Sequence, residues 1–119
     1  MNKTEFGKIG ESITCKYLCQ NHYKIIDKNY YYKGGEIDII AYDEDKNEIV
    51  FIEVKSRSSI QYGCPSEAVN KQKIRHLYRT AKYYLYKNKY LNNYIRFDVI
   101  EIFIFIEFYL IVKILVPAF

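Results

Sequence analysis

The 119-residue sequence predicts an α/β domain in which two helices and a set of strands share one core. Apolar residues recur at helical spacing over residues 4–20 and again over 66–87. Three apolar-alternating runs lie between residues 24 and 55, and a further strand-like run covers 94–102. A chain of this length can bury a single core without staples. We therefore expect one domain, residues 1–119, with its core at about residues 4–102.

The first predicted helix, residues 4–20, carries two stripes. Its principal apolar stripe is Phe6, Ile9, Ile13 and Tyr17. Glu11 falls on a different side, near Thr14, Cys15 and Leu18. Because this second stripe is mixed rather than fully charged, two alternatives stay open. Glu11 reaches into a cleft beside the sheet, or it is an ordinary exposed glutamate.

Residues 24–32 predict the first strand, and Gly34 and Gly35 supply the freedom for a tight turn after it. Two further strands, 36–41 and 48–55, flank a polar segment at 42–47 and predict a hairpin. The three strands then follow one another in meander order.

Side chains on a strand alternate between its two faces. Glu36, Asp38 and Ile40 are therefore predicted to share one face, opposite Ile37 and Ile39.

On the third strand, Phe51, Glu53 and Lys55 share a side by the same alternation. A turn centred near residues 45 and 46 places Asp38 across from Glu53. Two carboxylates about 5 Å apart, at an effective dielectric of about 20, repel by roughly 3 kcal/mol. A hard divalent cation held between them would relieve that repulsion, and Lys55 would stand beside it. The alternative is the ordinary charged, wet face of an antiparallel hairpin.

The chain also carries an ordered set of short motifs. They are G-x-x-G-E at 7–11, Y-L at 17–18, G-E-I-D at 35–38, E-V-K at 53–55 and R-F-D-V-I at 96–100. The central pair is similar to the D…(D/E)-x-K signature of restriction-endonuclease-like nucleases. From residue 7 to residue 102 the sequence resembles the YraN family of small bacterial proteins.

This resemblance implies a restriction-endonuclease-like αβββαβ core, with a mixed central sheet flanked by helices. It implies that Asp38 and Glu53 are metal ligands for Mg²⁺ or Mn²⁺, and that Lys55 is the catalytic lysine. The Val54 carbonyl is a further candidate ligand, and Glu11 matches a glutamate that related junction-resolving nucleases add from the first helix. A homodimer is compatible with the resemblance, since many such nucleases cut two strands as pairs.

Basic residues are concentrated in one segment. Between Glu67 and Asp98 stand eight basic residues and no acids, so this segment carries +8 and the rest of the chain −4. The eight are Lys71, Lys73, Arg75, Arg79, Lys82, Lys87, Lys89 and Arg96. The asymmetry indicates a surface that binds nucleic acid, with a basic but merely solvated helix face as the alternative.

Within the second helix, Gln72, Arg75, Arg79 and Lys82 form a polar, mainly basic stripe suited to a phosphate backbone. Arg57, just after Lys55, is a further candidate for holding a phosphate.

Three cysteines, Cys15, Cys19 and Cys64, cannot all pair within the chain, and the first residues lack an apolar signal segment. A reducing cytoplasm is the simplest location. Cys15 and Cys19, with His22 nearby, could in principle bind zinc, but incidental thiols fit the spacing better.

The segment 103–119 is almost continuously apolar, interrupted by Glu107 and Lys113. It is too short and too interrupted for a membrane span, so we expect a buried strand and no membrane partner. Association with a membrane through this segment is the alternative.

The sequence as a whole predicts a metal-dependent endonuclease that hydrolyses DNA, with branched or recombination and repair intermediates among its candidate substrates. The alternative is a nucleic-acid-binding or protein-interaction module that keeps the nuclease scaffold without turnover.

Overall fold

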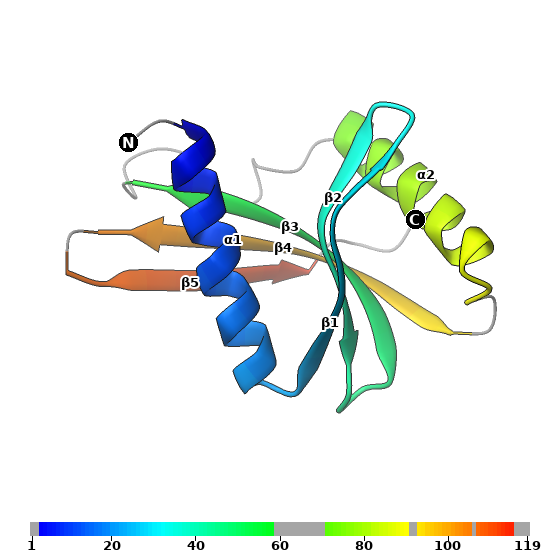
Figure 1. Cartoon of the computed structure of the whole chain (residues 1–119), viewed down its shortest axis with the longest axis horizontal. Coiled ribbons are helices and arrows are strands. Elements are labelled where there is room, and N and C mark those ends of the chain that lie inside the picture. The colour runs from blue at the N-terminus through cyan, green and yellow to red at the C-terminus, as the bar shows by residue number, and fades with distance from the viewer. Residues whose placement is uncertain (1–2, 59–70, 91–92, 106, 116–119) are drawn as a thin grey trace.

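The computed structural model describes residues 3–58, 71–90, 93–105 and 107–115. Its elements are α1 (Lys3–Gln20), β1 (Tyr23–Tyr32), β2 (Gly35–Asp43), β3 (Glu48–Arg57), α2 (Lys71–Lys87), β4 (Tyr94–Ile104) and β5 (Tyr109–Leu115). The strands form one sheet in the order β1-β2-β3-β4-β5 (Figure 1). Strands β3 and β4 are parallel, and the other neighbours are antiparallel. The predicted αβββαβ order and mixed sheet are confirmed, with β5 added at the edge.

The two helices cover opposite faces of the sheet. In Figure 1, α1 crosses in front of β3, β4 and β5, whereas α2 lies beside the β1–β2 hairpin. On the α1 side, Leu18 packs with Ile52 and Ile100. On the α2 side, Leu77 and Tyr84 belong to a second cluster, which also contains Ile37, Ile40 and Phe51. The sheet is therefore covered on both faces. The first part of the predicted second helix, residues 66–70, lies outside the described residues.

The most buried face of α1 differs from the predicted one. Gly10, Thr14 and Leu18 are buried, whereas the predicted stripe from Phe6 to Tyr17 is only half-buried. The cause is Gly10, because a Cβ there would collide with the Ser56 hydroxyl and lie 3.1 Å from Ile102. The bare backbone lets α1 approach β3 and β4 closely. This approach sets Glu11, the next residue, against the sheet.

Strand β2 does not alternate regularly. Ile37 and Ile40 pack in the same core cluster, whereas Ile39 packs on the other side of the sheet. The prediction that Ile37 and Ile39 share a face is therefore wrong. The ladder between β1 and β2 has no pair at Asp38 and Asn29, and Asn29 adopts a left-handed backbone with φ 51°. This local irregularity shifts the alternation at Asp38.

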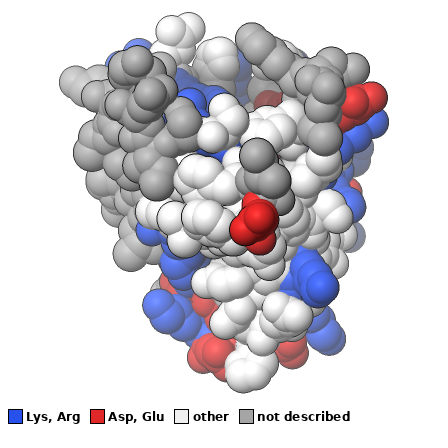
Figure 2. Space-filling model, turned by 90° about the vertical axis from the view of Figure 1, so that its left-hand side faces the viewer, with Lys and Arg blue, Asp and Glu red and all other residues white. Residues whose placement is uncertain are grey.

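The C-terminal apolar segment forms a hairpin with an exposed edge. Strand β4 continues to Ile104, the N–H of Phe105 donates a 2.8 Å hydrogen bond to the carbonyl of Phe108, and β5 follows. Tyr109 and Leu110 are exposed, so the expectation of a fully buried strand is wrong at this end. Because β5 pairs with β4 alone, its other edge has no neighbouring strand among the described residues. Figure 2, which views the end carrying this turn, shows a largely uncharged central surface.

A buried ionic network secures the opposite end of the sheet. The Arg96 guanidinium donates to carboxylates from three strands, Asp43 at 3.0 Å, Glu48 at 2.8 Å and Asp98 at 2.9 Å, and to the Tyr23 hydroxyl at 2.7 Å. The Arg96 side chain is only 13% exposed. Arginine suits this place because its planar fork of donors serves several acceptors at once. The R-F-D-V-I motif thus belongs to a structural network.

Candidate metal and nucleic-acid site

Asp38 lies where β2 and β3 stop pairing. The last recorded pair of that ladder joins Ile39 to Ile52, and the same register carried one step further sets Asp38 across from Glu53. There the backbone N–H of Val54 donates a 2.8 Å hydrogen bond to Oδ2 of Asp38. In an extended strand the N–H and C=O of one residue point toward the same neighbour. The Val54 carbonyl therefore faces the gap that Asp38 occupies.

The Asp38 side chain is half-buried, with other acids nearby. Burial raises its pKa to about 7, the Val54 N–H bond opposes this shift, and the nearby carboxylates of Glu11, Glu53 and Glu36 add to it. At neutral pH such a group lies close to the midpoint of its titration, so a cation near it would favour the charged form. Perturbed carboxyls of this kind are concentrated at functional sites, although structural networks also produce them.

Two lysines from different elements contact Glu53, which is only 8% exposed. Lys55 Nζ lies 3.3 Å from Glu53 Oε1, and Lys73 Nζ, reaching in from α2, contacts the same oxygen. Glu53 Oε2 is buried and has no hydrogen-bond partner in the described chain. Burial lowers the pKa of Lys55, and Lys73 contributes to that shift. For Lys73, burial acts in the same direction and is the largest single cause, but the hydrogen bonds to Glu53 and Lys55 and the charges of Glu53 and Asp38 together raise the pKa.

Sequence reasoning counted Lys73 only as part of the basic segment. Its signal was its spacing, because Lys73 stands four residues before the buried Leu77 and so shares the inward face of α2.

Glu11, on α1, is linked to Glu36 of β2 by the side-chain amide of Asn29. The side-chain nitrogen of Asn29 donates to Glu36 Oε1 at 3.2 Å and lies 3.4 Å from Glu11 Oε1. Glu11 is half-buried, so the alternative of an ordinary exposed glutamate does not describe it. Asn29 was also missed from the sequence. Its left-handed backbone is a conformation that asparagine tolerates better than most residues.

The donors present suit a hard cation held partly by water. Among the described residues, no three His, Cys, Asp or Glu side chains converge closely enough to hold a metal. Two carboxylates and a carbonyl remain, and Mg²⁺ commonly binds through one or two carboxylates while keeping several waters. The unpartnered Glu53 Oε2 is an acceptor that such an ion would satisfy. The oxygen donors at the end of the β2–β3 ladder are therefore of the chemical type that Mg²⁺ or Mn²⁺ takes.

The other predicted contacts lie on α2 and at the end of β3. Gln72, Arg75, Arg79 and Lys82 are all exposed on α2, on the side away from its buried face. Arg57 is 44% exposed and its Nε lies 3.6 Å from Glu101 Oε2, so it forms an ion pair beside the site.

The zinc alternative gains no support from the described residues. Cys15 and Cys19 are free thiols on α1, and His22 instead lies 3.1 Å from Asp45. Cys64 lies outside the described residues.

A mixed sheet flanked by two helices, with opposed acids and an E-x-K lysine where two antiparallel strands part, defines an α/β protein compatible with a restriction-endonuclease-like core. The chain belongs to the uncharacterised protein family UPF0102, which residues 10–102 match. UPF0102 is the YraN family, so the resemblance drawn from the motifs is confirmed.

Relatives cover nearly the whole chain. A UPF0102 protein of Clostridioides difficile is 49% identical over 104 residues, which are 87% of this chain and 90% of the relative. One from Caldicellulosiruptor saccharolyticus is 45% identical over 87% and 86% of the two chains. A UPF0102 protein of Clostridium botulinum is 50% identical over 82% and 79%.

Of the helices in the described ranges, neither is long and apolar enough to cross a membrane.

Proposed function

We propose that this protein is a cytoplasmic, Mg²⁺- or Mn²⁺-dependent endonuclease that hydrolyses phosphodiester bonds in DNA. The observation that carries the proposal is the hydrogen bond from the Val54 N–H to Asp38, which brings this acid to the stretch of β3 that holds the Glu53–Lys55 ion pair. One buried carboxylate oxygen of Glu53 has no partner among the described residues. Branched or recombination intermediates are the substrate class that the family's likeness to junction-resolving nucleases favours.

Each residue has a role that follows from its chemistry. Asp38 and Glu53 supply hard oxygen ligands, and the Val54 carbonyl faces the same gap. When bound, the cation would supply an activated water and offset charge on the phosphoryl oxygens. Lys55 provides an ammonium that orients that water or stabilises the extra negative charge of the transition state.

The exposed side of α2 supplies the binding surface. Gln72, Arg75, Arg79 and Lys82 follow one another along this side, where they can contact successive phosphates without reading bases. Affinity from such contacts depends strongly on salt.

The proposal is tested with purified protein on branched and linear DNA, with and without Mg²⁺ or Mn²⁺. We expect cleavage that requires the metal and falls by at least about 100-fold in Asp38→Ala and Lys55→Ala. Glu44→Ala and Lys46→Ala are matched controls, since both side chains are exposed in the β2–β3 turn at the other end of the hairpin. Unchanged cleavage in the two site variants would refute these roles.

One observation favours a second candidate, a nucleic-acid-binding module without turnover. Glu53 is already neutralised by two ammonium groups, as expected of a site that needs no metal. Calorimetric titration with Mn²⁺ separates the two. Salt-sensitive DNA binding by a protein that does not bind Mn²⁺ would select the module.

A further inference from the structure

Lys73 reaches this site from the basic helix α2. It contacts Glu53 Oε1, the oxygen that Lys55 also contacts, and its side chain remains 33% exposed. It lies on the inward face of α2, whereas Gln72, Arg75, Arg79 and Lys82 are exposed on the other side of the same helix. Lys73 thus belongs to the helix that carries the predicted phosphate-binding surface and contacts the predicted metal ligand.

Building on the proposed function, we propose that Lys73 is a coupling residue that links cation binding at Glu53 to nucleic-acid binding along α2. In the protein alone, its ammonium neutralises Glu53 and lowers the affinity of the site for a divalent cation. A phosphate of the nucleic acid offers the same ammonium another partner. The cation then binds more tightly.

The geometry explains why Lys73 rather than Lys55 has this role. Lys55 belongs to β3 itself, two residues from Glu53 on the same face, so its stem is fixed by the sheet. Lys73 reaches Glu53 from a helix that also presents exposed basic residues. Both ammonium groups contact Oε1, which leaves Oε2 buried, unpartnered and available to a cation.

Binding reciprocity makes the inference measurable. If phosphate binding at Lys73 raises cation affinity at Glu53, the cation must raise nucleic-acid affinity by the same factor. A variant without the ammonium should bind the cation more tightly from the start and gain less when nucleic acid is added.

The test is calorimetric titration with Mn²⁺, first without DNA. We expect the Kd for Mn²⁺ to fall by about fivefold or more in Lys73→Met, because a like charge beside the cation is removed. Lys46→Met removes an exposed charge in the β2–β3 turn, at the other end of the hairpin, and should change this Kd by less than about twofold. Lys73→Arg keeps the charge and should remain near wild type. Lys73→Gln is a second neutral variant, and circular dichroism confirms that each variant is folded.

The second measurement repeats the titrations with a short phosphorothioate DNA duplex that resists cleavage. We expect DNA to tighten Mn²⁺ binding in the wild type by a larger factor than in Lys73→Met. Equal or weaker Mn²⁺ binding by Lys73→Met without DNA would overturn the inference, as would an equal DNA effect in both proteins. In either case a saturable wild-type Mn²⁺ site would leave the proposed function standing. No saturable binding in any variant would count against the metal site and the coupling together.

Discussion

The backbone N–H of Val54 donates a 2.8 Å hydrogen bond to Oδ2 of Asp38, across the point where β2 and β3 part. This bond ties the acid of one strand to the residue between Glu53 and Lys55 on the next. It fixes the spacing of the site before any ligand is present, but it only partly compensates for the burial of the carboxylate.

The pH dependence of stability should therefore report on Asp38. Its pKa is raised to about 7 in the folded protein, so the folded state holds the proton more tightly than the unfolded chain. Metal-free stability should fall as pH rises from about 4 through about 7, and Asp38→Asn should remove this fall. In urea unfolding with a chelator, we expect the variant to be about 1–3 kcal/mol more stable than wild type near pH 8, and nearly equal near pH 4.

The exposed Glu44→Gln variant serves as the control for that experiment. If the difference in the free energy of unfolding between wild type and Asp38→Asn is the same at both pH values, Asp38 does not titrate in this range.

The affinity for a divalent cation should also depend on the ionisation of Asp38, but this affinity should increase with pH, whereas stability decreases. Ligation needs the ionised carboxylate, so Mn²⁺ affinity should weaken progressively as pH falls below about 7, by up to about tenfold per unit. Calorimetry at several pH values measures this slope. A Kd that stays constant from about pH 8 to about pH 6 would exclude Asp38 as a ligand.

The contact between Gly10 and Ser56 should control how closely α1 approaches the sheet. Gly10→Ala places a methyl group against the Ser56 hydroxyl, and we expect a loss of about 1–3 kcal/mol in the free energy of unfolding. Ser56→Ala removes the hydroxyl, so the double variant should recover part of that loss. Gly7→Ala is the matched control on the same helix, since nothing lies within 4 Å of its added methyl. Additive losses in the double variant would show that the two residues do not compete for space.

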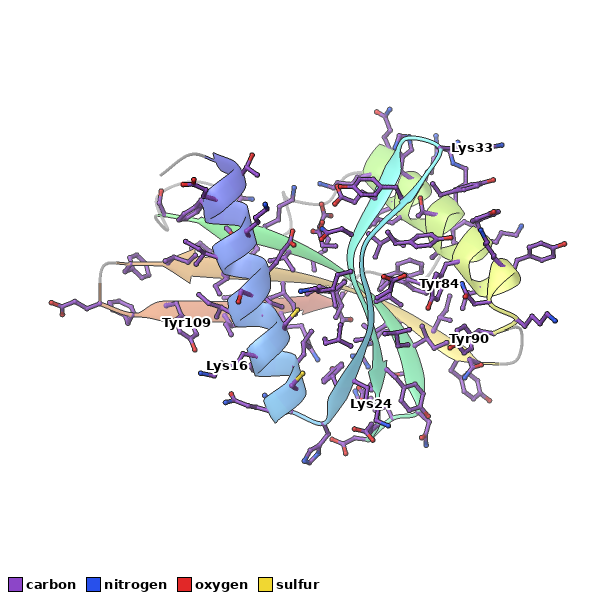
Figure 3. The ribbon with its side chains drawn as sticks, in the orientation of Figure 1. Lys16, Lys24, Lys33, Tyr84, Tyr90 and Tyr109 are labelled. Atoms are coloured by element: carbon purple, nitrogen blue, oxygen red, sulfur yellow. The ribbon has the colours of Figure 1, made fainter. Side chains whose placement is uncertain are left out.

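The basic stripe on α2 should bind DNA by contacting its backbone phosphates. We expect Arg75→Gln with Arg79→Gln to weaken DNA binding and to reduce the slope of log K against log salt by about 2. Lys16→Gln with Lys24→Gln removes the same charge from α1 and β1, away from α2 (Figure 3), and should leave the slope nearly unchanged. An equal effect of the two pairs would indicate attraction by net charge alone.

The network around Arg96 should be a major source of stability. Burial acts to raise the pKa of Asp43, but hydrogen bonds from Arg96 and from the backbone at Lys46 hold that pKa below its usual range. Arg96→Met leaves buried carboxylates without their cation, and we expect a loss of about 3–5 kcal/mol near neutral pH.

A carboxyl whose pKa is lowered by folding stabilises the folded state at pH values above its unfolded-state pKa. That stabilisation is lost as the pH falls through its folded-state pKa. The loss in the free energy of unfolding caused by Arg96→Met should therefore become smaller at low pH. A cost that is independent of pH would assign the loss to packing rather than charge.

Local pattern was enough to predict the meander and the register of the β2–β3 hairpin, because a short polar turn fixes which residues of a hairpin meet. The last recorded pair, Ile39 with Ile52, is one step from the predicted pairing of Asp38 with Glu53. Local pattern could not predict the irregularity at Asp38. That irregularity depends on the left-handed backbone of Asn29, a feature with no alternation signal. Lys73 was missed for a related reason. Its spacing marks it as facing inward on α2, but spacing within one helix does not show that Glu53, on a distant strand, lies opposite. The close approach at Gly10 depends on what lies opposite, which a helical stripe does not encode.

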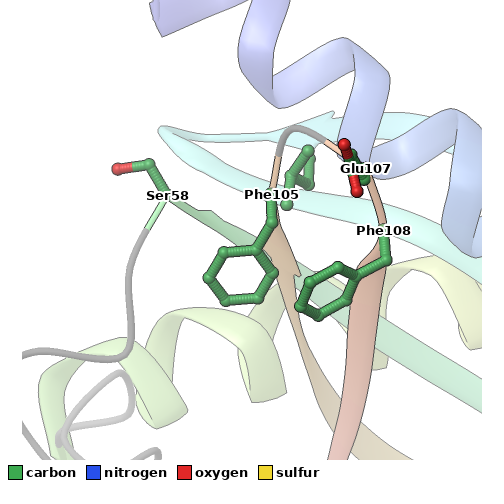
Figure 4. Close-up of a pocket in the computed structure, with 5 residues that line it drawn as sticks. Ser58, Phe105, Glu107 and Phe108 are labelled. Atoms are coloured by element: carbon green, nitrogen blue, oxygen red, sulfur yellow. The ribbon is translucent and has the colours of Figure 1, made fainter.

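The hairpin at the end of β4 also departed from expectation because Glu107 is the sole polar residue of its turn in the sequence. Phe105 and Phe108 stack across it with ring centroids 4.7 Å apart, beside a hollow that Ser58 also lines (Figure 4). Aromatic stacking here takes the place of the polar residues that usually mark a turn.

The parallel pairing of β3 with β4 sets the order in which the candidate site is completed during synthesis. Asp38, Glu53 and Lys55 are all translated before α2, yet β3 gains its second neighbour only after the whole crossover has left the ribosome. Lys73 reaches Glu53 from that same crossover. A nascent chain therefore holds the three residues before Lys73 and β4 are in place.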